Sequence, residues 1–341
     1  MKRAVSLFLL CALLLSGCTG TAGPELKQYN ATFLDLFDTV TTIVGKAESP
    51  EAFRETAQVV HDALLEYHRL FDIYNDYEGI TNLKTVNDAA GGEPVTVDPR
   101  IIRLLSDCKE YYELTHRRVN PAMGSVLYLW HEARNDSFND PANAYIPEEH
   151  QLSEASAHMD FNHVIIDRER STVQITDPQL RLDVGAIAKG WAVQRVCETA
   201  PSGLLISVGG NVCATGPKDS SGTPWVVGIQ DPEGGEEYLH TLYLTTGSIV
   251  TSGDYQRCFV ANGELYHHII DPDTRMPGKH WRSVTIVCPD SGLADALSTA
   301  LFLLPLEEGL ALIADLDAEA MWVDAAGQRF YSPGFEALIR T

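Results

Sequence analysis

The chain has 341 residues, of which 45% are hydrophobic and 21% are charged, a composition typical of a folded protein rather than a disordered one. Its 47 Asp and Glu residues outnumber its 25 Lys and Arg residues, so the formal net charge is −22. Such a charge repels nucleic acids, and no cluster of Lys and Arg offsets it, which argues against a nucleic-acid partner. An anionic small ligand would need a metal cation or a focused group of donors in order to bind.

The N-terminal segment predicts a lipoprotein signal peptide. Lys2 and Arg3 precede the apolar stretch 4–15, which is too short to span a bilayer and is typical of a signal-peptide core. The stretch ends in Leu15-Ser16-Gly17-Cys18, which resembles the lipobox of bacterial lipoproteins, in which the Cys is diacylated and becomes the new N-terminus. An ordinary cleaved signal followed by an incidental Cys is the alternative.

Two acyl chains anchor a protein stably without a membrane-spanning helix. We therefore expect a protein held by its lipid anchor at a bacterial cell membrane, on the extracytoplasmic face. The chain divides into a signal peptide at 1–17, the lipidated Cys18 with its tether at 18–30, and a single large domain at 31–338.

Hydrophobic periodicity predicts the first elements of the domain. A β-branched run predicts a strand over 32–44, and apolar residues at helical spacing predict a long helix over 50–73. A second helix is predicted over 98–115, beginning with an N-cap Asp followed by Pro. The polar stretch 134–158, rich in Pro and Asn, is interpreted as an excursion on the surface.

From residue 164 onward, the predicted strands are more frequent than the helices. Strands are expected at 164–167, 172–176, 180–183, 204–208, 225–230, 239–245, 248–251, 266–270 and 283–287, and helices at 188–198, 294–303 and 306–314. Because strands and helices do not alternate strictly, we predict an α+β fold with a mixed sheet core and flanking helices, rather than a doubly wound sheet.

The segment from Asp183 to Gly190 reads Asp-Val-Gly-Ala-Ile-Ala-Lys-Gly and leads from a predicted strand into a predicted helix. Its small residues would let a ligand approach the backbone closely, and a helix N-terminus favours an anion. Lys189 would add a positive charge for a phosphate. The order of Gly and Lys does not match a P-loop, and a tight turn filled with small residues is the alternative.

Asp295 and Thr299 are four residues apart in a predicted helix, so their oxygens project from one face with β-carbons about 5–6 Å apart. Carboxylate and hydroxyl oxygens are hard donors suited to Mg²⁺, which keeps several water or phosphate ligands. The alternative is that Asp295 interacts with the helix dipole near the N-terminus and that Thr299 has no role in binding.

Two adjacent His residues, His267 and His268, lie near the end of an apolar predicted strand. Neighbouring strand residues face opposite ways, so the pair cannot chelate one ion without a bulge, and one His is expected to face the interior and the other the solvent. A His with a reference pKa of about 6.5 is suited to act as a general base. A core His bonded to the backbone is the alternative.

Two further segments offer groups that could bind a ligand. Ser252, Gly253 and Asp254 follow a predicted strand and supply a hydroxyl, a turn and a carboxylate. Tyr74 and Tyr77 follow the first long helix and could stack on a planar ring, for which packing in the core is the alternative.

These segments occur in a distinctive order along the chain. In sequence, they are Phe37-Asp38-Thr39, Phe71–Tyr74, Asn120–Gly124, Leu182–Gly190, Val208-Gly209-Gly210, Thr251–Tyr255, His268–Pro272 and Ala294–Ala300. The succession resembles that of the ApbE family of FAD:protein FMN transferases, and the resemblance covers about residues 33–335. The lipobox agrees with this resemblance.

The resemblance implies a Mg²⁺-dependent enzyme that moves FMN from FAD onto a Thr or Ser hydroxyl of an acceptor flavoprotein and releases AMP. The implied acceptors are a redox-pump subunit or an FMN-binding-domain protein. Mg²⁺ would be held by the backbone carbonyl of Ala186 with Asp295 and Thr299, and His268 would be the catalytic base. The residues that the resemblance places around FAD are Phe37, Tyr74, Arg118, Val119, Asn120, Asp183, Lys189, Ser252, Gly253, Asp254 and Ile270.

Four positions depart from the usual family pattern. Ala186 stands where many members have Gly, Asn120 where Asp is common, Gln194 where Asp is frequent, and Arg275 where Gly is usual. Two alternative functions remain open: a Mg²⁺-dependent FAD pyrophosphatase that gives FMN and AMP, and a flavin-binding lipoprotein without chemistry. A chain with a charge of −22 needs a cation to bind the dianionic pyrophosphate of FAD, which agrees with Mg²⁺.

Overall fold

The computed structural model describes residues 26–235 and 237–340. The predicted signal peptide, Cys18 and most of the predicted tether lie outside these residues. Within the described ranges, no helix combines the length and the apolar composition that crossing a membrane requires.

The fold is built around one eight-stranded sheet in which every neighbouring pair of strands is antiparallel. In spatial order its strands are β1 (Lys27–Leu36), β2 (Thr39–Ala47), β6 (Leu204–Val208), β7 (Asn211–Ala214), β10 (Gly247–Gly253), β13 (Ser283–Cys288), β14 (Glu319–Val323) and β15 (Arg329–Tyr331). Three smaller sheets accompany it. They join β3 (Val95–Thr96), β5 (Thr172–Ile175) and β4 (Val164–Asp167); β8 (Trp225–Gln230) and β9 (Tyr238–Leu244); and β11 (Cys258–Ala261) and β12 (Glu264–His267).

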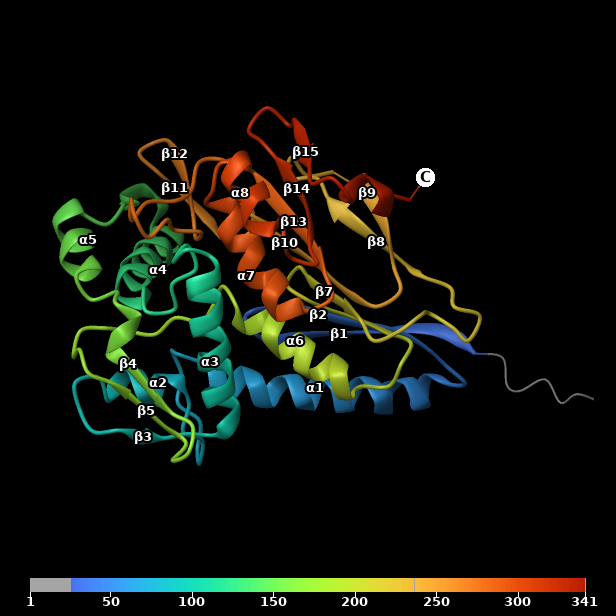
Figure 1. Ribbon diagram of the computed structural model, residues 1–341, viewed down its shortest axis with the longest axis horizontal. Coiled ribbons are helices and arrows are strands. Elements are labelled where there is room, and N and C mark those ends of the chain that lie inside the picture. Colours follow the sequence, from blue (N-terminus) through green and yellow to red (C-terminus); the bar gives the residue numbers. More distant parts are fainter. Residues whose placement is uncertain (1–25, 236, 341) are drawn as a thin grey trace, which may run out of the picture.

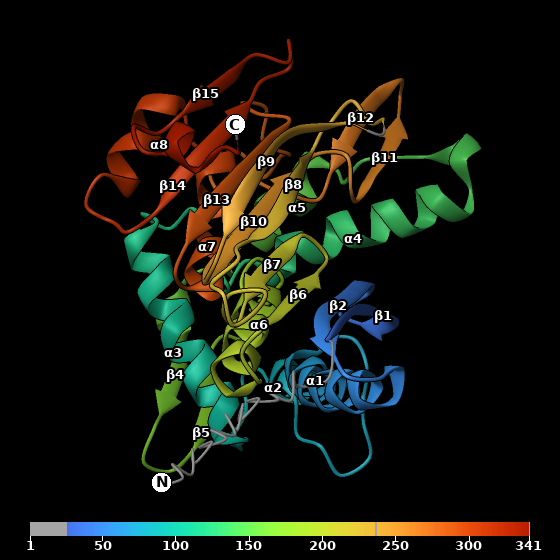
Figure 2. The same cartoon turned by 90° about the vertical axis from the view of Figure 1, so that its right-hand side faces the viewer.

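Helices cover one face of the main sheet and extend beyond one end of it (Figures 1 and 2). They are α1 (Pro50–Phe71), α2 (Leu83–Asp88), α3 (Pro99–Leu114), α4 (Gly124–Asn139), α5 (Glu149–Ser156), α6 (Ala188–Thr199), α7 (Ser291–Phe302) and α8 (Leu306–Ile313). Helix α1 packs on β1 and β2, α6 on β6 and β7, and α7 on β10 and β13.

The opposite face of the sheet is covered by the β8–β9 pair. Successive residues of a strand face opposite sides, and in β10 Ile249 packs with β8 and β9 whereas Val250 packs with α7. The sheet is therefore buried on both faces near its centre, where β10 ends at the cavity described below.

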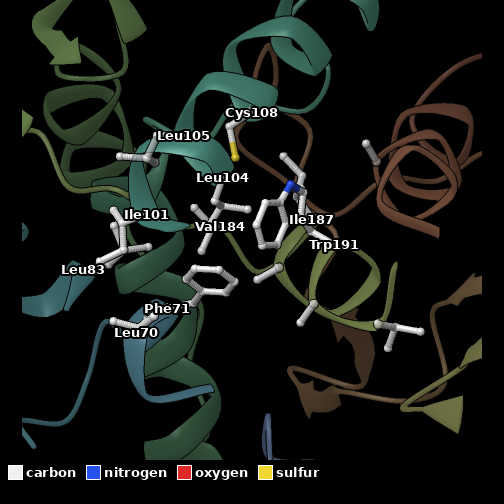
Figure 3. Packing of buried hydrophobic residues seen from close by; sticks show 14 of the residues in the cluster. Leu70, Phe71, Leu83, Ile101, Leu104, Leu105, Cys108, Val184, Ile187 and Trp191 are labelled. Carbon is white, nitrogen blue, oxygen red and sulfur yellow. The ribbon is translucent and has the colours of Figure 1, made fainter. Parts of the chain in front are cut away.

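Helix α1 begins at Pro50 because the Ser49 hydroxyl accepts a hydrogen bond from the Ala52 amide at 3.1 Å, and Pro fits the first turn. Its last residue, Phe71, contacts Trp191 of α6 edge to face, with ring centroids 5.5 Å apart. Figure 3 shows these two rings beside Leu104 and Cys108 of α3. Trp191 is only 1% exposed, so this core fixes the first turn of α6, which carries Lys189.

The strand predicted over 32–44 is in fact two strands, β1 and β2, joined by a turn at Phe37 and Asp38. Both turn residues have positive φ, 53° and 51°, as the central residues of a type I′ hairpin turn do. Asp38 tolerates positive φ, but neither residue is the Gly that such a turn favours, so the turn signal in the sequence is weak. The turn brings Phe37 to the edge of the cavity.

The stretch 134–158, interpreted as an excursion on the surface, is mostly exposed, but it contains helical segments that were not predicted. Helix α4 continues to Asn139, and α5 forms at Glu149–Ser156. Each helix packs by one face only, with Ala133 and Leu152 buried, so most of its residues are polar and exposed and the apolar pattern is weak.

The remaining differences concern the ends of elements and the strands that were not predicted. The segment 180–183 forms only an isolated bridge between Arg181 and Met123, the strand predicted at 266–270 ends at His267, and the helix predicted at 294–303 begins at Ser291. The strands not predicted are β3, β7, β11, β14 and β15, and the short helix α2 was not predicted either. The predicted α+β class, with a sheet core and flanking helices, is confirmed, but the main sheet is antiparallel rather than mixed.

Candidate active site

A cavity of about 280 Å³ lies where the ends of several elements meet. The β1–β2 turn, the segment after α1, the start of α6, the end of β10, the segment after β12 and one face of α7 all contribute to its lining. The predicted site residues that line it are Phe37, Tyr74, Arg118, Val119, Asn120, Asp183, Ala186, Lys189, Ser252, Gly253, His268, Ile270, Asp295 and Thr299.

Asp254 was also predicted as a site residue, but it does not line the cavity. Its carboxylate lies 2.7 Å from Nε of Arg282, and it is 8% exposed. The neighbouring Ser252 hydroxyl is 2.8 Å from that of Ser298 in α7. The structure therefore gives Asp254 an ion pair behind the cavity wall.

The turn from Asp183 to Lys189 is folded back on itself. The Asp183 carboxylate accepts a hydrogen bond from the Gly185 amide at 2.8 Å, and Nζ of Lys189 donates to the Gly185 carbonyl at 3.1 Å. Desolvation raises the pKa of Asp183, while the Gly185 amide acts in the opposite direction. Ala186, in the middle of this turn, lines the cavity.

Asp295 is the most enclosed carboxylate of the cavity, at 3% exposure. Its Oδ2 accepts a hydrogen bond from the Gly190 amide at 2.9 Å and lies 3.5 Å from Nζ of Lys189. Burial raises its pKa, and Lys189 opposes that effect. Helix α7 begins at Ser291, capped by Asp290, so Asp295 lies in the second turn rather than at the dipole end.

Hard oxygen donors surround Asp295. Thr299, one turn further along α7, and Ala186 line the same cavity, and the buried Oδ1 of Asn211 has no hydrogen-bond partner. In the described part of the chain, no group of three or more His, Cys, Asp or Glu residues is arranged to hold a metal. A set made of one carboxylate, one hydroxyl and one carbonyl fits Mg²⁺, which prefers oxygen ligands and keeps several waters.

The two adjacent His residues have different surroundings. His267 is a buried residue whose Nε2 lies 2.8 Å from the Gly278 carbonyl, and whose Nδ1 accepts from the Ile269 amide at 3.2 Å. His268 lines the cavity and does not face the solvent as expected for one of the pair. Its buried Nδ1 has no hydrogen-bond partner among the residues that the structure describes. Burial, followed by the charges of Arg257 and Lys189, lowers the pKa of His268 to about 3, so its imidazole is neutral at pH 7.

Aromatic and amide groups form another part of the lining. The Tyr74 ring stacks on His131 with centroids 4.7 Å apart, and the Phe37 amide donates to Nδ1 of His68 at 3.1 Å. Both polar groups of the Asn120 side chain are occupied, by the Met159 carbonyl and by the Ala122 amide. Asn120 therefore fixes its own loop beside the cavity.

Several lining residues were not predicted from the sequence. His131 and Arg134 come from α4, Asn211 from the start of β7, and Arg257 from the segment before β11. His131 and Arg134 are three residues apart, a helical spacing that the polar composition of α4 conceals. Asn211 directly follows the Gly209-Gly210 pair, and that pair was the feature of the sequence that could have drawn attention to it.

Comparisons with known proteins agree with this arrangement. The ApbE family model matches residues 37–322. The FAD:protein FMN transferase of Treponema pallidum is 34% identical over 282 residues, 76% of each chain, and that of Klebsiella pneumoniae is 30% identical over 274 residues, 76% of this chain and 82% of the relative.

Solved structures share the fold. The crystal structure of the ApbE protein of Thermotoga maritima has a TM-score of 0.81 at 28% identity and covers 92% of this chain and 100% of that one. The flavin transferase ApbE of Vibrio cholerae, at 21% identity and a TM-score of 0.75, covers 92% of this chain and 100% of its own and shows likeness of fold alone. Since the family model spans most of its length, this chain belongs to the ApbE family.

Proposed function

We propose that the protein is an FAD:protein FMN transferase that moves FMN from FAD onto a Thr or Ser hydroxyl of an acceptor flavoprotein and releases AMP. One observation carries the proposal: a single cavity combines a buried carboxylate, a hydroxyl and a backbone carbonyl with a neutral His. The curated relatives, which are FAD:protein FMN transferases, support the same substrate and reaction.

In this proposal, FAD binds with its planar rings beside Tyr74 and Phe37 and its pyrophosphate near Lys189 and the first turn of α6. The Tyr74–His131 stack supplies a flat aromatic surface. Lys189 and the amides at the start of α6 favour an anion. The half-buried carboxylate of Asp183 and the buried carboxylate of Asp295 would repel the pyrophosphate without a cation.

Ala186, Asp295 and Thr299 would hold Mg²⁺ through their carbonyl, carboxylate and hydroxyl oxygens. When bound, Mg²⁺ neutralises phosphate charge and acts as a Lewis acid on the pyrophosphate. The Gly190 amide, by bonding Oδ2 of Asp295, fixes the orientation of that carboxylate.

His268 would act on the acceptor hydroxyl. The hydroxyl gives its proton to the neutral imidazole while its oxygen forms a bond to the FMN phosphorus. The bond from that phosphorus to the bridging oxygen breaks, and AMP leaves with the bridging oxygen. Phosphate charge beside His268 raises its pKa in the complex, which makes it a better base there than in the free protein. A positioned base contributes about 10²–10⁴-fold to the rate.

The location of the enzyme belongs to the same proposal. Cys18, diacylated after removal of residues 1–17, would anchor the domain at the extracytoplasmic face of a bacterial membrane. Labelling with a radioactive fatty acid tests this directly: the wild-type chain is expected to be labelled and Cys18→Ala is not. Equal labelling of both would remove the anchor from the account.

The transfer reaction is tested by the intact mass of the acceptor. A purified FMN-binding-domain protein is incubated with the enzyme, FAD and Mg²⁺, and each component is omitted in turn. The acceptor is expected to gain one FMN only when all are present, and an acceptor whose target hydroxyl residue is replaced by Ala gains none. Abundant free FMN with an unmodified acceptor would identify an FAD pyrophosphatase instead.

A further inference from the structure

Among residues 26–235 and 237–340, two arginines of the cavity have no carboxylate partner. Arg118 and Lys189, the other cations of the lining, pair with Asp271 and Asp295 respectively. Arg134 of α4 and Arg257, just before β11, also line the cavity, but neither forms an ion pair within the described residues. In a chain with 47 acidic residues, two such guanidinium groups in one cavity call for an explanation.

The contacts of both arginines are with neutral groups. One terminal nitrogen of Arg134 lies 3.2 Å from Nδ1 of His131, and one of Arg257 lies 3.2 Å from the Phe37 carbonyl and 3.4 Å from the Asp38 carbonyl. A guanidinium group has five N–H donors. Each arginine therefore keeps donors free to bind a ligand.

The two positive charges influence each other and His268. Burial, and then the charge of Arg257, lowers the pKa of Arg134. After burial, Arg257 is the largest influence that lowers the pKa of His268, and Arg134 adds to it. Both arginines thus lie within electrostatic reach of the proposed base, as does Lys189, which pairs with Asp295.

The lining of the cavity thus holds charges of both signs. Asp183 and Asp295 attract a cation, whereas Arg134 and Arg257 attract an anion. A planar guanidinium group matches the geometry of a phosphate, to which it donates two parallel hydrogen bonds. Arg134 is half-buried and Arg257 is exposed, and their positive charges repel each other. A bound oxyanion would remove that repulsion.

We propose that Arg134 and Arg257 form an oxyanion subsite that binds the phosphate of the FMN half of FAD. This inference rests on the proposed function, because it takes the flavin dinucleotide as the ligand. The subsite would hold the phosphoryl group that is transferred. It would also stabilise the negative charge that the phosphoryl oxygens carry during transfer.

The test compares FMN with riboflavin, which lacks the phosphate. Both are titrated by flavin fluorescence into the full-length protein with EDTA present, so that no metal contributes to phosphate binding. The wild-type protein is expected to bind FMN at least about tenfold more tightly than riboflavin. Arg134→Gln is expected to remove most of that preference while leaving riboflavin affinity unchanged, and Arg134→Lys to retain part of it.

Matched controls separate the subsite from general effects. Arg103, exposed on α3 and outside the cavity lining, gives the control Arg103→Gln, for which the preference should stay at the wild-type value. Arg257→Gln is expected to act like Arg134→Gln. Circular dichroism checks that each variant is folded. If Arg134→Gln does not fold, the binding comparison is made with Arg134→Lys instead.

Three results would overturn the inference. They are equal affinities of the wild-type protein for FMN and riboflavin, an equal loss of both ligands in Arg134→Gln, and a loss of AMP binding while FMN binding is retained. The binding assay contains no acceptor, so its outcome is independent of transfer. If the wild-type protein transfers FMN but does not prefer FMN to riboflavin, the subsite alone is contradicted. If the wild-type protein prefers FMN, Arg134→Gln removes that preference, and no transfer is found, the proposed function alone is contradicted.

Discussion

Gly190 is the point of closest approach between α6 and α7, and its replacement tests how the site is built. A Cβ atom placed on Gly190 would lie 2.2 Å from the Ser291 carbonyl oxygen and 2.5 Å from Cβ of Asp295. Both neighbours belong to the first turns of α7 and cannot rotate away, so the two helices must separate. The separation would also stretch the 2.9 Å bond from the Gly190 amide to Asp295.

The magnitude follows from two opposing terms. Overpacking of a well-filled interior costs about 1–3 kcal/mol, whereas Gly→Ala within a helix gains roughly 0.5–1 kcal/mol. We therefore expect Gly190→Ala to lower the free energy of unfolding by about 1–2 kcal/mol and to weaken the Mg²⁺ dependence of transfer.

Urea unfolding followed by circular dichroism measures the stability, with Gly309→Ala as the control. Gly309 also lies in a helix, but its added Cβ would meet only side-chain atoms, Leu301 Cδ2 and Trp322 Cζ2, both at 3.3 Å. Those atoms can shift by a few tenths of an ångström, so a much smaller change is expected. Gly→Ala at a helix position with open space around it stabilises a protein by roughly 0.5–1 kcal/mol. If Gly190→Ala did the same, the close contact would play no part in holding α6 to α7.

Three further outcomes are expected. His268→Ala should retain FAD binding in a titration but lower the rate of FMN transfer at least about tenfold, and an unchanged rate would remove its role as base. Asp295→Ala should weaken both the Mg²⁺ dependence and FAD affinity, and an unaltered metal dependence would refute the metal assignment. His61 is buried, which lowers its pKa, but hydrogen bonds to Asp62 and Asp35 outweigh burial and raise it. Its stabilising effect is thus complete below the unfolded pKa of about 6.5 and is lost as the pH rises through the folded value. His61→Gln should therefore destabilise the protein more at pH 5 than at pH 9 in urea unfolding, by about 1 kcal/mol or less.

Sequence reasoning succeeded where the signal was local. The long helix α1 combines an N-cap Ser, an initial Pro and a regular apolar face, and its predicted ends differ from the observed ones by only two residues at the C-terminal end. The segment from Asp183 to Gly190 owes its shape to its small residues. The pair Asp295 and Thr299 keeps its relative position because both lie in one helix.

It failed where distant parts of the chain decide the conformation. The turn at Phe37 and Asp38 contains no Gly and only one residue, Asp38, that favours turns. His68 and Arg257, far away in the sequence, bond its backbone. The ion pair that draws Asp254 to Arg282 is likewise a product of the folded sheet. Arg275, which stands where the family usually has Gly, adopts a φ of 61°, so its loop keeps the left-handed conformation that Gly would favour.

The ratio of AMP released to FMN attached tests the central claim most directly. In one reaction containing the enzyme, FAD, Mg²⁺ and an acceptor, AMP is quantified by chromatography and acceptor-bound FMN by intact mass. A transferase that passes FMN directly from FAD to the hydroxyl is expected to give equal amounts of the two at every time point. AMP that accumulates with free FMN, while the acceptor keeps its original mass, would contradict the account.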